Sequence, residues 1–73
     1  QNFFDFVNLH RVEEVKIRIT DPANNHLPLL GIAYESGFNS KSAFYSSFRK
    51  ITRMTPVEYR RKHQPEREKV FSN

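Results

Sequence analysis

Apolar residues recur along residues 3–20 in the spacing of one face of a helix. This face comprises Phe3, Phe6, Val7, Val12, Val15 and Ile19. The dipeptide Asp21-Pro22 ends the helix, because proline disfavours the helical conformation of the residue before it. Three further apolar residues lie off this face, and we expect them to contact a part of the protein outside this chain: Phe4, Leu9 and Ile17.

A loop and a short second helix follow. Residues 22–28 are rich in proline and asparagine, which break helices, and a helix is expected from Leu29 to Ser36. Its buried face comprises Leu29, Ile32 and Ala33. Gly37 ends this helix, because glycine readily adopts the positive φ found after many helices. Gly31 is unfavourable inside a helix, so we expect a neighbouring backbone to approach it closely.

The third helix is capped by Asn39 or Ser40 and is expected to run to Ile51 or Thr52. Its apolar side comprises Phe44, Phe48 and Ile51. The spacing of Ala33 and Gly37 before it is typical of a helix-turn-helix, which needs a small residue where its helices cross and a permissive residue in the turn. An ordinary helical hairpin uses the same devices, so this spacing by itself leaves both open.

A fourth helix begins at a capping box with proline at its first position, Thr55-Pro56-Val57-Glu58. It is expected to end near His63. Residues 64–73 are charged without periodicity, and we expect them to form a disordered tail. The pattern therefore predicts an all-α fold of four helices.

Composition and charge narrow the possible functions. The 73 residues suffice for one domain with a small core, and the absence of cysteine fits a reducing cytosol. No apolar run approaches the roughly 18 residues that span a bilayer. Residues 1–39 hold three Lys/Arg against five Asp/Glu, whereas residues 40–73 hold nine against three. Such asymmetry points to a polyanionic partner for the second half, either nucleic acid or an anionic membrane. Charge alone leaves a merely solubilising surface equally open.

The polar side of the third helix sharpens this expectation. The arc opposite its phenylalanines holds Ser42, Ser46, Arg49 and Arg53, flanked by Tyr45 and Lys50, with Lys41 at the helix start. No acidic residue occurs between Asn39 and Val57. The major groove of DNA admits a helix of this kind and presents hydrogen-bond acceptors to it.

These residues resemble the second helix-turn-helix of the AraC/XylS family. The similar stretch is Ile32-Ala33 with Gly37-Phe38, then Phe44, Phe48, Arg49-Lys50, Thr55-Pro56 and Glu58-Tyr59-Arg60. Upstream, the family's long joining helix is similar to Asn2-Phe3, Phe6-Val7, Arg11 and Val15. The resemblance implies a homeodomain-like helical domain: residues 1–21 a linker helix, residues 22–63 the second helix-turn-helix with its closing helix. A first helix-turn-helix would precede Gln1 in the intact protein.

The resemblance also implies a cytoplasmic, sequence-specific DNA-binding transcription regulator that acts on RNA polymerase. The third helix would place its first group at base edges or nearby phosphates: Ser40, Lys41, Ser42, Tyr45 and Ser46. Arg49 and Lys50 would neutralise phosphates. The family commonly has a glycine where this chain has Arg53, which puts the local turn geometry in doubt.

Other functions find little support in the sequence. The three histidines, His10, His26 and His63, lack metal-ligand spacing, and neither a catalytic triad nor a cofactor-binding loop is present. No metal, cofactor, enzymatic activity or membrane contact is therefore expected. Arg11 is expected to pair within the protein. The alternative that stays open is a helical protein-interaction module whose basic face meets an acidic partner.

Overall fold

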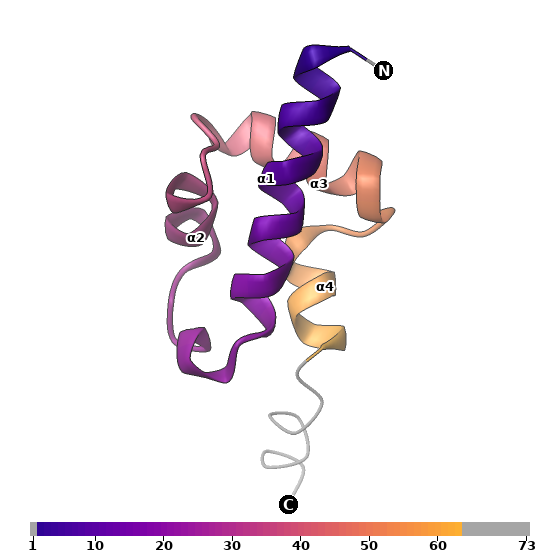
Figure 1. The fold of residues 1–73 in the computed structure, drawn as a ribbon. Coiled ribbons are helices and arrows are strands. Elements are labelled where there is room, and N and C mark those ends of the chain that lie inside the picture. Colours follow the sequence, from indigo (N-terminus) through magenta and orange to yellow (C-terminus); the bar gives the residue numbers. More distant parts are fainter. Residues whose placement is uncertain (1, 64–73) are drawn as a thin grey trace, which may run out of the picture.

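The computed structural model describes residues 2–63, which form four α-helices and one short 3-10 helix (Figure 1). The elements are α1 (Phe3–Thr20), η1 (Pro22–Asn24), α2 (Leu29–Glu35), α3 (Lys41–Thr52) and α4 (Pro56–Lys62). No strand occurs within the described range, in agreement with the all-α prediction. The tail expected over residues 64–73 lies outside the described residues.

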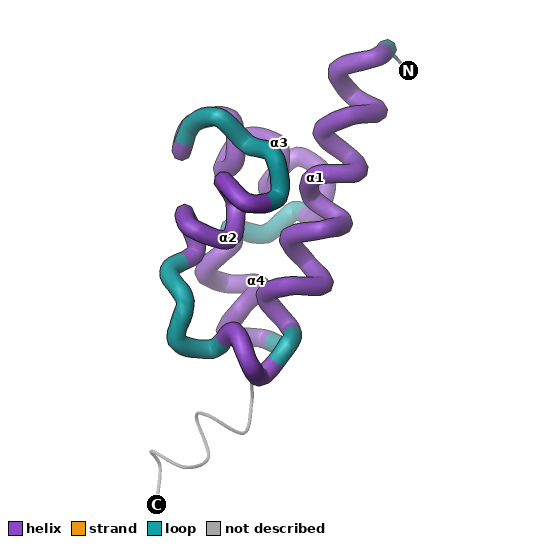
Figure 2. Tube along the Cα trace, turned by 60° about the vertical axis from the view of Figure 1, so that its left-hand side comes forward, coloured by secondary structure: helices purple, strands orange, loops and turns teal. Residues whose placement is uncertain are grey.

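Helix α1 runs through the middle of the molecule, with α2 on one side, α4 on the other and α3 crossing behind it (Figure 1). Its first turns extend past the other helices, which is clearest in the rotated view (Figure 2). The core gathers residues from three helices and the turn between α2 and α3: Val12, Val15, Ile19, Ile32, Ala33, Phe38, Phe44 and Phe48. The long helix therefore serves as the common support of the other elements.

The prediction of the buried face of α1 is correct only for its second half. Its second half is buried as expected, but Phe3 and Phe6 are 73% and 51% exposed. They lie in the first turns of α1 and meet rings of the same helix, Phe3 beside Phe4 at 6.2 Å and Phe6 beside His10 at 4.5 Å between centroids. Phe4 and Ile17 are exposed, as their positions off the face predicted.

Helix α2 matches its predicted span within one residue and buries Ile32 and Ala33. The close backbone approach expected at Gly31 is wrong. A Cβ built there would meet only the ring of Pro28, with Cγ at 3.6 Å, which is an ordinary contact. The glycine is therefore not required by packing.

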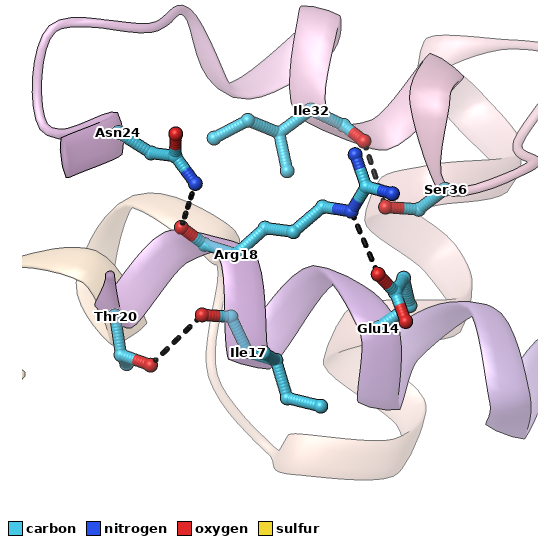
Figure 3. A network of polar contacts seen from close by, with 7 residues as sticks. All are labelled: Glu14, Ile17, Arg18, Thr20, Asn24, Ile32 and Ser36. Carbon is cyan, nitrogen blue, oxygen red and sulfur yellow. Dashed lines mark hydrogen bonds and ion pairs between the residues drawn. The ribbon is translucent and has the colours of Figure 1, made fainter. Parts of the chain in front are cut away.

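A small polar network fixes the end of α1 to the following loop (Figure 3). The Arg18 guanidinium donates to Glu14 at 2.8 Å, and the Asn24 side-chain amide donates to the Arg18 carbonyl at 3.0 Å. The hydrogen bond to Glu14 raises the pKa of Arg18 above its usual value. Farther along the chain, Arg60 of α4 donates to the Asn24 carbonyl at 2.9 Å, which ties α4 to the same loop.

The predicted capping box of α4 is present. The Thr55 hydroxyl accepts from the Glu58 backbone N–H at 3.1 Å, and the Glu58 carboxylate accepts from the Thr55 N–H at 2.8 Å. Behind it, Pro56 is buried and the Tyr59 ring meets Phe48 edge-on, with centroids 5.4 Å apart. The box therefore fixes both the start and the direction of the closing helix.

Truncation of Phe44 should unfold a domain of this size. The side chain is fully buried, so Phe44→Ala should lower the free energy of unfolding by about 3–5 kcal/mol in urea or thermal unfolding. Phe4→Ala is the matched control: this ring is 75% exposed, and its loss should change stability by less than about 0.5 kcal/mol. Equal losses in the two variants would contradict the helical register described above.

The capping box also predicts a pH dependence. The hydrogen bonds from the Thr55 backbone and side chain lower the pKa of Glu58. A carboxyl group whose pKa is lowered by folding stabilises the fold above its unfolded pKa of about 4.3, and this contribution disappears as the pH falls through the folded pKa. Glu58→Gln preserves the capping box without titrating, so its unfolding midpoint should lose this acid sensitivity. A wild type and a variant with parallel pH profiles below about pH 4.3 would contradict it.

Candidate nucleic-acid interface

The turn between α2 and α3 is closed by a Schellman motif. Gly37 has φ of 108°, as predicted for the residue that ends α2. Its N–H donates to the Tyr34 carbonyl at 3.1 Å, and the N–H of Phe38 donates to the Ala33 carbonyl at 3.0 Å. The motif sends Phe38 back into the core, where it is 2% exposed.

Arg11 of α1 holds this turn from the outside. Its guanidinium lies 5.9 Å from the Phe38 ring centroid, a cation–π arrangement, and donates to the Asn8 side chain at 3.3 Å. A Cβ on Gly37 would come within 3.0 Å of the Arg11 Nε. Arg11 thus pairs within the protein, as expected, and Gly37 is needed both for its φ and for the space that Arg11 occupies.

Helix α3 begins at Ser40, whose hydroxyl accepts from the Ala43 N–H at 3.1 Å. Four residues later, the Phe44 ring packs between Phe38 and Phe48, with centroids 5.4 Å and 5.8 Å away. Both ring contacts hold one side of α3 against the core, so the opposite side is turned outward. The structure leaves these polar residues exposed: Ser40, Lys41, Ser42, Ser46, Arg49, Lys50 and Arg53.

Tyr45 differs from the other proposed contact residues because it is half-buried. Its ring meets Phe44 edge-on at 5.4 Å, and the Lys41 ammonium lies 5.7 Å from its centroid. The tyrosine therefore lies at the border between the core and the exposed face, where it supports Lys41.

Lys50 lies on the side of α3 that meets α1. Its ammonium is 3.8 Å from the Asp5 carboxylate, and both side chains are largely open to solvent. An open groove of about 440 Å³ runs between the two helices here and is lined by Asp5, Asn8, Leu9, Ser46, Ser47, Lys50 and Ile51. Sequence reasoning missed this pairing, because residues 45 positions apart carry no local signal of contact.

At the end of α3, Arg53 occupies the position where the family that the sequence resembles commonly has a glycine. Arg53 adopts the left-handed conformation, with φ of 65° and ψ of 17°. The Thr52 hydroxyl donates a hydrogen bond to the Phe48 carbonyl at 2.8 Å and accepts one from the Met54 N–H at 3.1 Å. Hydrogen bonds on both sides of Arg53 therefore hold a backbone conformation that non-glycine residues rarely adopt.

The electrostatic character of this face is uniformly positive along α3. The Glu58 carboxylate lies beyond the end of α3, and the charges of Arg49 and Arg61 contribute to the lowering of the pKa of Glu58.

Within the described part of the chain, no group of three histidine, cysteine or acidic side chains could hold a metal ion. Over the same range, every helix is too short or too polar to cross a membrane.

Two helices joined by a glycine turn, with the second presenting an exposed, acid-free face, define a helix-turn-helix domain. A family model described as a helix-turn-helix domain matches residues 1–62. The melibiose operon regulatory proteins of Escherichia coli strains K12 and O6:H1 are 33% identical to this chain over 63 residues, which are 86% of this chain and 20% of the relative. No solved structure matches the chain.

The chain belongs to the AraC-type helix-turn-helix family of DNA-binding transcription regulators, as the sequence resemblance implied. It spans about a fifth of the length of the curated relatives it matches.

The two glycines should respond oppositely to alanine. Gly31→Ala adds a methyl group where there is room inside a helix and should raise the free energy of unfolding by about 0.5–1 kcal/mol. Gly37→Ala forces a positive φ on an L-residue and crowds Arg11, so it should lower stability by at least about 1 kcal/mol. Urea unfolding of the two variants measures both effects, and a stabilised Gly37→Ala protein would refute the turn geometry.

Proposed function

We propose that this domain binds double-stranded DNA by placing α3 in the major groove. The observation that carries the proposal is the exposed side of α3, where hydroxyls and cations face outward without an acid while Phe44 and Phe48 anchor the other side. A groove-bound helix reads bases with its first turns and meets phosphates along its edges.

The proposed roles follow the position of each residue on α3. The first group would meet base edges or nearby phosphates: Ser40, Lys41, Ser42, Tyr45 and Ser46. Arg49 and Lys50 would neutralise phosphates. For Lys50 this contact competes with its ion pair to Asp5, whereas the half-buried ring of Tyr45 leaves its hydroxyl end as the part to reach DNA.

We further propose that α1 joins this unit to another helix-turn-helix in the full-length protein. Residues 1–21 would form the linker and residues 22–63 the second DNA-binding unit, so that two units occupy successive major grooves. Support comes from the exposed Phe3, Phe4 and Phe6 at the start of α1 and from relatives about four times as long as this chain. The whole protein would regulate transcription in the bacterial cytoplasm by acting on RNA polymerase.

Base readout and phosphate contact can be separated in the full-length protein by measuring several duplexes at two or more salt concentrations. Arg49→Gln should weaken binding to all duplexes alike and reduce the salt slope by about 1. Lys41→Ala and Ser46→Ala should instead change the sequence preference, by roughly 1–3 kcal/mol for a good base contact, with the serine at or below the bottom of that range.

The same titration tests the class of partner. If Lys41→Ala and Ser46→Ala weaken every duplex equally, α3 anchors on the backbone and does not read bases. Preference for an acidic protein over duplex DNA, without salt-dependent DNA binding, would instead establish the protein-interaction module.

A further inference from the structure

The end of α3 carries a second hollow, which adjoins the groove beside α1 and shares Ser46 and Lys50 with it. It has a volume of about 550 Å³ and is lined by Ser46, Arg49, Lys50 and Arg53. Ser46, Arg49 and Lys50 are three and four positions apart and so are neighbours on the surface of α3, and Arg53 follows directly after the end of the helix. Among residues 2–63, neither Arg49 nor Arg53 forms an ion pair, whereas Lys50 forms one with Asp5. The hollow therefore presents two guanidinium groups outside any ion pair, one of which interacts electrostatically with the nearby Glu58, and one ammonium paired with Asp5.

The positive charge of this hollow exceeds the partial negative charge of the helix end at which it lies. The carboxyl end of a helix carries about half an elementary negative charge, which disfavours an anion. Two arginines with no ion-pair partner exceed that partial charge several times. A guanidinium group can also donate two parallel hydrogen bonds to the oxygens of one phosphate, which an ammonium group does less well. An anion with several oxygens is thus the ligand that this hollow suits.

Arg53 lines the hollow and has a left-handed backbone. It is the one non-glycine residue of the described range with positive φ, and the Thr52 hydroxyl bonds on either side of it. A glycine would adopt this conformation without steric cost. The chain instead keeps a long cation at this position, exposed and directly after the last turn of α3.

We infer that Arg53, together with Arg49, forms a binding site for a phosphate of the DNA backbone. The inference rests on the proposed binding of duplex DNA and adds a contact residue to it. Ser46 lines this hollow and also lies on the exposed face of α3, so the site continues that face toward the end of the helix. A helix that reads bases with its first turns brings its last turn to the edge of the groove, where the backbone runs.

The test uses the full-length protein and a short mixed-sequence duplex, titrated at several salt concentrations. Arg53→Gly removes the cation while easing the backbone, so its melting temperature should equal or exceed that of the wild type. Its affinity for DNA should nevertheless fall about fivefold at physiological salt, with a salt slope smaller by about 1, as expected for one lost phosphate contact. Arg53→Lys should retain the slope. Lys16→Gln, which removes one charge from α1, is the control and should leave the slope unchanged.

The outcomes are distinguishable. Wild-type affinity and slope in Arg53→Gly, beside a reduced slope in Arg49→Gln, would overturn the inference while DNA binding stands. A loss of affinity that Arg53→Lys shares in full, or that accompanies a lower melting temperature, would assign Arg53 a structural role and also overturn it. Absence of salt-dependent duplex binding in the wild type would refute the proposed function itself.

Discussion

The packing of Phe44 and Phe48 against α1 is the interaction on which the rest of this structure depends. Both rings are fully shielded from solvent, and they meet Val12 and Val15 in a core that has few other large side chains. Because a helix has only one side available for such anchoring, burying this side of α3 decides which residues face outward. The stability of the fold and the composition of the exposed face thus have the same cause.

A second constraint places the start of α3. Gly37 reverses the chain, and the Arg11 side chain occupies the space beside it while lying over Phe38. The long helix α1 therefore contacts both the turn and the body of α3, and these two contacts together orient α3. In a small domain with a modest core, this double support orients the exposed face of α3 without further elements.

Much of the fold and of the candidate site was predictable because the signals were local. The hydroxyl of Ser40, the capping box at Thr55 and the glycine at position 37 act on groups within a few residues, so sequence spacing reveals them. The exposed side of α3 followed from helical periodicity once its phenylalanines were assigned to the core. For the same reason the intermediate exposure of Tyr45 was not predictable, since its angle on the helix lies between the two sides.

The sequence by itself determined the four helices, their caps and the sign of the charge on α3, because these depend on contacts between near neighbours in the chain. Only the tertiary structure decided that Phe3 and Phe6 stay exposed on the first turns of α1, and that Asp5 pairs with Lys50. The left-handed backbone of Arg53 also escaped the sequence, although the Thr52 hydrogen bonds beside it are local. In the first two cases the outcome depends on where one helix crosses another. At Arg53, these local hydrogen bonds hold a conformation that the residue itself disfavours, and so its residue type gave no sign of it.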